Sequence, residues 1–302
     1  MITAALDPWR WQAHPEVWFV VGSLVALGWY AARVIGPKVV PEGEPVVTRR
    51  QKGFFVAGLV TLWVAADWPV HDIAEDYLYS LHMIQHTLLA YVAPPLFLLA
   101  TPTWLARLII GEGRLWRWVK VLTVPVIAAV LFNAVVIFTH WPTVVNFSVS
   151  NGIVHYLVHV LVVASAFLMW TPVCGPFPEL RMSLPGQMIY LFAMSIVPTV
   201  PAAWLTLGGT IIYSAYDDPQ RLWGISALAD QQMAGLIMKL GGSAYLWGII
   251  TVMFFQWAAR HERAERTGRA LSEREVLTWD QVEAQFDEHP APSEPPVTPN
   301  GR

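Results

Sequence analysis

The chain is poor in cysteine and in charged side chains, and both shortages narrow the classes of protein that it can be. Cys174 is the single cysteine among 302 residues. One cysteine excludes an internal disulfide and any metal motif built from paired cysteines. Charged residues make up 14% of the chain and the net charge is −3, whereas an average soluble domain has about 25% charged residues. This charge balance gives no support for nucleic-acid binding.

Several catalytic and targeting signatures are also missing. The sequence has no HExxH zinc-protease motif, no glycine-rich phosphate loop and no Ser-His-Asp pattern that stands out. The N-terminal sequence MITAALDPWRWQAHPE lacks the basic start and the small-residue cleavage site of a secretory signal peptide. We therefore expect the first hydrophobic segment to be retained.

Long apolar runs dominate the rest of the chain. Hydrophobic residues make up 55% of it, and its 16 tryptophans favour the headgroup level of a bilayer. A helix needs about 20 mainly apolar residues to cross the hydrocarbon core. Stretches of this kind are Val17–Ile35, Gly53–Ala66, His82–Ala100, Val119–Thr139, Gly152–Thr171, Gln187–Leu207 and Leu236–Ala258. The sequence predicts an all-α fold, a polytopic integral membrane bundle of seven transmembrane helices.

The positions of lysine and arginine predict the orientation of this bundle. Basic residues follow the first, third, fifth and seventh stretches, as in Lys38, Arg107, Arg181 and Arg260. Cytoplasmic loops are the basic ones, so we expect the N-terminus outside and the C-terminus in the cytoplasm. The opposite loops are acidic, and one of them carries Asp67, Asp72, Glu75 and Asp76. That loop is either an ordinary solvated segment or a surface that attracts cations.

The composition changes after the last apolar stretch. We expect a transmembrane domain over residues 1–259 and a charged, helical cytoplasmic extension over residues 260–286. Residues 287–302 are rich in proline and lack large apolar side chains, which predicts a disordered tail.

The histidines gather at one predicted membrane face. The predicted orientation places six histidines at the external face: His71, His82, His86, His140, His155 and His159. Two of these groups, His82/His86 and His155/His159, are spaced four residues apart, which places both rings on one side of a helix. Two such helices facing each other could offer four nitrogens to one metal ion. His14, His261 and His289 are expected to have no such role.

Methionines and amides near these histidines extend the candidate site. Met83, Met233 and Met238 are candidate ligands, and Gln85, Asp230 and Gln231 are candidate partners that orient a ligating histidine. Imidazole suits copper, zinc, iron and nickel, whereas thioether selects Cu(I). The mixture favours copper as Cu(I). The structural alternatives are histidines that join helices by hydrogen bonds, methionines that fill the core and an Asp230 that caps the last helix.

Other histidine chemistries stay open at this point. A single bis-histidine haem or metal centre would make the chain a membrane redox protein. Prolines such as Pro94, Pro95 and Pro198 break predicted spans, as in transporters of cations, but no charged residue lies at their depth. A scaffold that binds other proteins without any metal is a further alternative.

Two segments resemble a known family. SLHMIQHTLLAYVAPPLFLLATP (residues 80–102) and ADQQMAGLIM (residues 229–238) are similar to the CtaG-type cytochrome c oxidase assembly factors, a seven-span bacterial family. The His155/His159 pair and Leu277–Phe286 are similar as well, so the resemblance runs from about Trp9 to Phe286. The matching positions are His82, Met83, Gln85, His86, Asp230, Gln231, Gln232, Gly235 and Met238. After Met238 the family often has Trp and a Pro-Gly turn, whereas this chain has Lys-Leu-Gly-Gly.

The resemblance implies a multi-pass protein of the bacterial plasma membrane that helps a haem-copper oxidase to mature, at its copper-loading stage. It implies oxidase subunits and the lipid bilayer as partners, together with an extracytoplasmic copper donor. We expect a non-enzymatic assembly factor that holds copper transiently between the third and fifth spans.

Overall fold

The computed structural model describes residues 7–217 and 221–275. Within these residues the secondary structure is helical throughout, which confirms the predicted all-α class. The chain divides into two compact units, residues 1–253 and 254–302.

The helices of the first unit follow one another through short connections. Their bounds are α1 (Pro15–Tyr30), α2 (Gly36–Val39), α3 (Arg49–Ala66), α4 (Val70–Asp76), α5 (Tyr79–Thr87), α6 (Ala93–Ala100), α7 (Thr103–Ile110), α8 (Arg114–Leu122), α9 (Pro125–Thr139), α10 (Pro142–Val149), α11 (Gly152–Cys174), α12 (Leu184–Ile196), α13 (Thr199–Leu207), α14 (Ala227–Leu236) and the start of α15 (Gly242–Glu275). Segments of π-helix at Ala31–Ile35, Leu88–Val92 and Ile237–Gly241 join α1 to α2, α5 to α6 and α14 to α15.

Several of these helices are long and apolar enough to cross a membrane. Six helical segments of the described chain meet this criterion: Pro15–Val39, Arg49–Asp76, Tyr79–Ala100, Gly152–Cys174, Leu184–Leu207 and Ala227–Thr267. The expected seventh, Val119–Thr139, is not one straight helix. The chain bends by 78° between α8 and α9, because Pro125 begins α9 and disfavours helical geometry at the preceding residue. The count reaches seven only if this bent pair is one span.

Where these membrane helices break, side chains from other helices donate hydrogen bonds to the backbone carbonyls that lack a partner within the helix. Pro94 has no N–H to give to the carbonyl of Ala90, four residues earlier. The Trp170 indole of α11 donates to that carbonyl at 3.1 Å. At the break between α12 and α13, Lys239 Nζ donates to the Ser195 carbonyl at 3.0 Å. Since hydrocarbon offers no water, such donors make the breaks tolerable, and the first one fixes α11 against the α5–α6 span.

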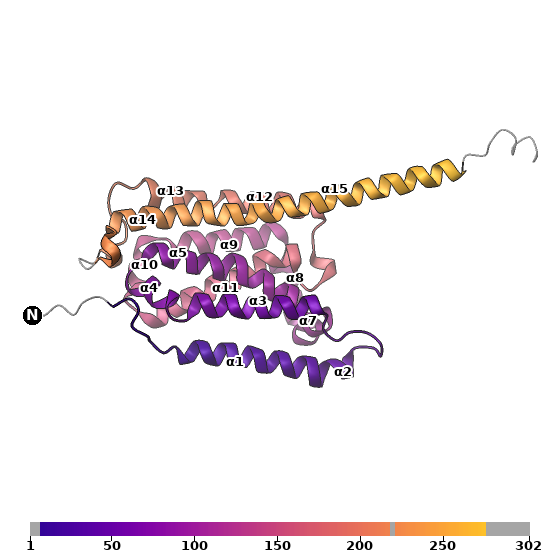
Figure 1. The fold of residues 1–302 in the computed structure, drawn as a ribbon, viewed down its shortest axis with the longest axis horizontal. Coiled ribbons are helices and arrows are strands. Elements are labelled where there is room, and N and C mark those ends of the chain that lie inside the picture. The colour runs from indigo at the N-terminus through magenta and orange to yellow at the C-terminus, as the bar shows by residue number, and fades with distance from the viewer. Residues whose placement is uncertain (1–6, 218–220, 276–302) are drawn as a thin grey trace, which may run out of the picture. The chain divides into compact units, whose positions relative to one another are not determined.

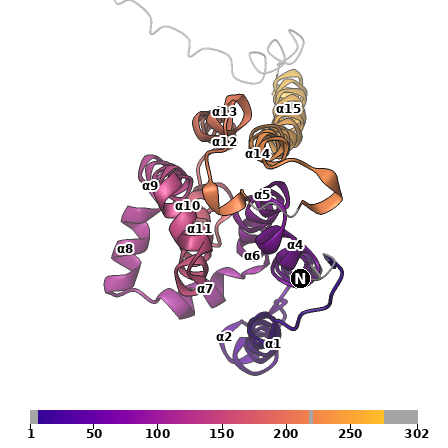
Figure 2. The same ribbon diagram turned by 90° about the vertical axis from the view of Figure 1, so that its left-hand side faces the viewer.

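The packing brings together helices that are far apart in the sequence. α5 packs against α4 and α14, α6 packs against α3 and α11, and α11 also packs against α9 and α10 (Figures 1 and 2). α4, α10, the start of α5 and the start of α14 lie at one end of the unit, and α7 and α8 lie at the other (Figure 1). The first end therefore holds the predicted external histidines.

The second unit is described up to Glu275, which ends α15. Within it the Trp257 and His261 rings stack with centroids 5.6 Å apart, and Arg266 Nη2 donates to Glu262 Oε1 at 2.6 Å. The family-like segment Leu277–Phe286 and the expected disordered tail, residues 287–302, lie outside the described residues.

Candidate metal centre

Asp230 fixes the start of the helix that carries the first histidine pair. Its carboxylate accepts hydrogen bonds from the Tyr79 N–H at 2.7 Å and the Ser80 N–H at 3.0 Å. These are the first N–H groups of α5, which lack partners within the helix and favour a negative charge. α5 therefore begins at Tyr79 and carries His82 and His86 in its first two turns.

The second histidine pair lies in the first two turns of α11. The Asn151 side chain accepts a hydrogen bond from the Val154 N–H at 3.2 Å, so Asn151 is the N-cap of that helix. His155 and His159 follow four and eight residues later. The rings of the two pairs meet between α5 and α11, so both pairs lie at the same level.

The structure brings the four imidazole rings together. Centroids lie 4.4 Å apart for His82 and His86, and 4.5 Å apart for His155 and His159. Between the helices, His82 lies 5.5 Å from His155 and 5.7 Å from His159, and His86 lies 4.8 Å from His159. These are the two pairs that the sequence places at one membrane face.

A carboxylate completes the group. Glu75 of α4 places Oε1 2.5 Å from His155 Nε2. One ligand atom from each of Glu75, His82, His155 and His159 lies within 4.8 Å of the other three. We call these four residues the inner group. Four ligand atoms within this distance could surround one metal ion after small side-chain movements.

The inner group and its neighbours have unsatisfied polar atoms. Buried side-chain atoms with no hydrogen-bond partner in the described structure include His82 Nδ1, His86 Nε2, His140 Nε2, His159 Nε2, Glu75 Oε1 and both ring nitrogens of His155. His155 Nε2 and Glu75 Oε1 are close, but their orientation does not make a hydrogen bond. A buried polar atom without a partner costs about 1–3 kcal/mol. Such a concentration is unusual in a protein interior and is what a metal ion would relieve.

A small cavity lies beside the inner group. Its volume is about 20 Å³, and its walls include His82, His86, His140 and His155. About 10–15 Å³ is enough for one water molecule. The cavity therefore has room for one water or one ion and not for a macrocycle.

The remaining walls of the cavity combine apolar side chains, such as Val145 and Val149, with uncharged polar ones, such as His140 and Tyr216. His140 follows α9, and its Nδ1 lies 2.7 Å from the Val136 carbonyl oxygen. Burial lowers the pKa of His140, so its imidazole is neutral and its Nε2 is available as a ligand. Burial also raises the pKa of Tyr213 to about 12 and raises that of Tyr216, so both phenols are neutral at physiological pH.

Three other predicted residues lie near the histidines. Met83 is 3% exposed and lines the cavity. The Gln85 amide nitrogen lies 3.0 Å from His71 Nδ1. His71 in turn lies 3.9 Å from Glu75 Oε1. Gln85 and His71 therefore adjoin the inner group on the side of α4.

The structure places the other predicted residues elsewhere. Met233 is 39% exposed, and Met238 packs against apolar core residues. The hydrogen bonds of Asp230 go to the start of α5. Gln231 accepts from the Ile212 N–H at 2.7 Å and donates to the Thr210 carbonyl. Both side chains bond to backbone groups and not to a histidine ring, so these contacts give no support to the prediction that Asp230 and Gln231 orient a ligating histidine.

The position at which α14 begins explains why Asp230 does not cap its own helix. Apolar length predicts that the last span begins at Leu236, but α14 already begins at Ala227 and Ser226 is its N-cap. Asp230 therefore lies inside a helix, with its carboxylate directed to a neighbouring helix. Its alternative role as the cap of its own helix is wrong.

Two residues that lie near the histidines, Glu75 and His14, were not predicted as ligands from the sequence. The sequence places Glu75 in an external acidic loop and gives His14 no role. His14 Nε2 lies 2.9 Å from Asp72 Oδ1. The four-residue spacing of His71 and Glu75 was the available signal for Glu75, since it suggests a short helix with both side chains on one side. No signal in the sequence joins His14 to Asp72.

An apolar groove of about 1340 Å³ runs between α1 and the rest of the first unit. Its walls are mainly aliphatic and aromatic side chains of α1, α3, α6 and α11, and one end reaches His71, Gln85 and His159. The histidines therefore adjoin a polar end of the unit and an apolar, membrane-level surface.

Membrane-length helices and a buried histidine–glutamate group define the class of this chain, a multi-pass helical membrane protein with a candidate metal-binding group. A model of the cytochrome c oxidase caa3 assembly factor family, Caa3_CtaG, matches residues 27–260. The chain belongs to this family. Comparisons with curated proteins and with solved structures gave no match.

Proposed function

We propose that this chain binds a copper ion at the inner group during the assembly of cytochrome c oxidase and passes the ion to an oxidase subunit. Membership of the oxidase assembly factor family supports the oxidase as the partner. The single observation that carries the copper-binding part is the inner group itself, with ligand atoms within 4.8 Å of one another and buried nitrogens that lack partners.

Copper is the metal that this chemistry and the family favour together. Three imidazoles and a carboxylate are a harder ligand set than the expected mixture of histidine and methionine, and they suit Cu(II) better than Cu(I). Met83 on the cavity wall offers a thioether that would suit Cu(I). We propose that His82, His155, His159 and Glu75 are the ligands, with His86 and His140 within reach for ligand exchange.

The proposed location is the external side of the bacterial plasma membrane. Basic residues such as Arg107, Arg181 and Arg260 favour a cytoplasmic position for the opposite end. The apolar groove that reaches His159 gives a membrane-embedded oxidase subunit a lateral approach to the inner group.

Metal analysis of the full-length protein tests the proposal. The wild type and the double variant His82→Ala/His155→Ala are purified in detergent, incubated with copper, desalted and measured for bound copper. We expect about one copper per wild-type chain and no copper retained through desalting by the variant, because the variant removes two of four ligand atoms. The control is His261→Ala, which removes an exposed histidine of the second unit and should bind like the wild type.

Cells that carry the same variants test the assembly role. We expect oxidase copper content and oxidase activity to fall with His82→Ala/His155→Ala and to be normal with His261→Ala. Normal oxidase in the double variant would refute the assembly role. A Soret band in the purified protein would favour a haem protein, which the small cavity disfavours.

A further inference from the structure

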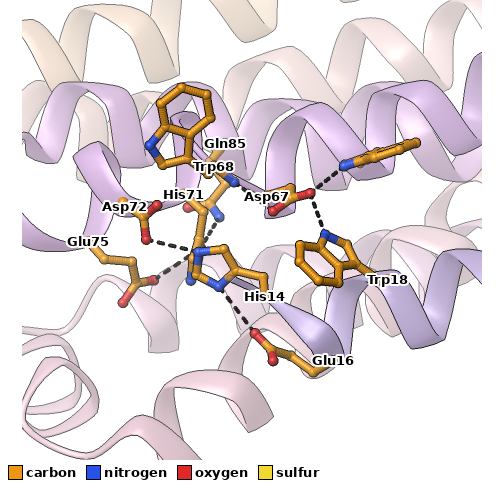
Figure 3. Close-up of polar contacts among 10 residues, drawn as sticks. His14, Glu16, Trp18, Asp67, Trp68, His71, Asp72, Glu75 and Gln85 are labelled. Carbon is orange, nitrogen blue, oxygen red and sulfur yellow. Dashed lines mark hydrogen bonds and ion pairs between the residues drawn. The ribbon is translucent and has the colours of Figure 1, made fainter. Parts of the chain in front are cut away.

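A second group of possible ligands lies on the outer side of Glu75. His14 Nε2 lies 2.9 Å from Asp72 Oδ1, and the rings of His14 and His71 meet edge to face with centroids 4.9 Å apart. His71 Nδ1 lies 3.9 Å from Glu75 Oε1. Figure 3 shows these side chains converging from the segment before α1 and from α4. We call His14, His71 and Asp72 the outer group.

The chain holds the outer group in place from both sides. His71, Asp72 and Glu75 lie within the two turns of α4. His14 directly precedes α1, and the Trp18 indole of that helix donates to Asp67 Oδ2 at 2.8 Å (Figure 3). Asp67 also accepts from the Trp68 N–H at 2.8 Å. Two side chains of one short segment, His14 and Trp18, therefore bind the chain just before and within α4.

The chemistry of the outer group indicates a cation. Asp72 is 5% exposed, and its Oδ2 has no hydrogen-bond partner in the described structure. Burying a carboxylate is expensive unless its oxygens are paired or bind a metal. His14 satisfies one oxygen of Asp72 and leaves the other free. Two imidazoles beside this carboxylate offer nitrogen and oxygen ligands that suit copper and zinc.

The spacing of the outer group suggests weak and exchangeable binding. Its ligand atoms are more widely spaced than those of the inner group, which is the group of described residues whose ligand atoms all lie within 4.8 Å of one another. Glu75 Oε1 lies only 2.5 Å from His155 Nε2 of the inner group. One carboxylate is therefore within reach of both groups.

We propose that the outer group is an entry site that binds the cation first, and that Glu75 carries it to the inner group. This inference depends on the proposed function, because it needs an inner group that accepts the ion. No electron or covalent bond changes in this step, since one set of ligands replaces another around the same ion. His14 lies outside the residues that match the family model, 27–260.

Copper uptake by the full-length protein tests the entry site. Stopped-flow mixing with Cu(II) is followed by the change in tryptophan fluorescence for the wild type, His14→Ala and His14→Gln. We expect uptake to slow about tenfold or more in both variants, the scale of losses around metal ligands, while equilibrium affinity for the inner group stays unchanged. Glutamine can still donate to Asp72 but is a poor ligand. If His14 serves only to hold the segment before α1 against Asp72, His14→Gln will take up copper at the wild-type rate. That result would overturn the proposal.

A variant without the inner group gives an independent measurement. In His82→Ala/His159→Ala the outer group is intact, and we expect weak copper binding that disappears when His14→Ala and Asp72→Asn are added. Equal copper content with and without these two changes would overturn the entry site. Thermal unfolding of each variant identifies a misfolded protein. If the wild type binds no copper at all, the proposed function fails together with this inference, whereas a normal uptake rate in His14→Gln removes the entry site alone.

Discussion

Glu75→Gln is the sharpest perturbation of the inner group. The substitution keeps the shape of the side chain and removes the one negative charge among the four ligand residues, since the other three are histidines. Glu75 Oε1 lies 2.5 Å from His155 Nε2, so an amide in its place can still reach that imidazole. Copper would lose its anionic ligand without a change in the position of the histidines.

The expected magnitude follows from the role of the carboxylate. Changes to groups that merely support metal ligands lower metal affinity about 10–100-fold, and a direct ligand should cost at least as much. That loss corresponds to about 1.4–2.8 kcal/mol. Thermal unfolding of the metal-free variant separates a loss of copper affinity from a loss of the contacts of Glu75 Oε1 with His155 and His71.

Competition with a chromophoric copper chelator measures the affinity, and the EPR spectrum of the Cu(II) form reports nitrogen and oxygen ligands. The matched control is Glu112→Gln, the same chemical change at an exposed residue between α7 and α8. We expect weaker copper binding and an altered EPR spectrum for Glu75→Gln only. Wild-type affinity in Glu75→Gln would refute the assignment of Glu75 as a ligand.

The remaining predictions concern stability and pH. Copper at 100 times its dissociation constant should stabilise the wild type against unfolding by about 2.7 kcal/mol, and an equally large thermal shift in His82→Ala/His155→Ala at the same copper concentration would contradict the inner group as its site. Copper affinity should fall as the pH is lowered, because protons compete with the metal for imidazole nitrogens; an affinity that does not change on acidification would argue against histidine ligands. Asp230→Ala removes the acceptor of two backbone N–H groups at the start of α5 and should cost about 2 kcal/mol in unfolding experiments. Ser226→Ala, which removes a cap with a single bond, should cost about 1 kcal/mol, so equal losses would contradict the special role of Asp230.

The candidate site contains buried polar atoms without hydrogen-bond partners, which lower the stability of the metal-free protein. Buried imidazoles and a carboxylate without partners destabilise the metal-free protein, and the caps at Asp230 and Asn151 hold the helix starts that carry them. The proposed transfer of copper gives a reason to retain such a group, because an ion that is passed on needs ligands that can exchange.

The sequence by itself determined the class of this protein and the parts of its site that are local. Apolar length predicts membrane helices because a bilayer core has a fixed thickness, and a spacing of four residues places His82 with His86 and His155 with His159 because a helix repeats every 3.6 residues. The segments that resemble the oxidase assembly factors lie on these same helices. Each of these inferences needs only neighbours along the chain.

Only the tertiary structure decided which residues from distant segments meet. Glu75 and His14 join the histidines through the packing of α4 and of the segment before α1, and Asp230 bonds to α5 across 151 residues of sequence. The bend between α8 and α9, by contrast, follows from Pro125, a local signal that apolar length does not reveal. A hydropathy pattern records burial and period but not which helix lies beside which, so it could indicate the two histidine pairs and not the carboxylate between them.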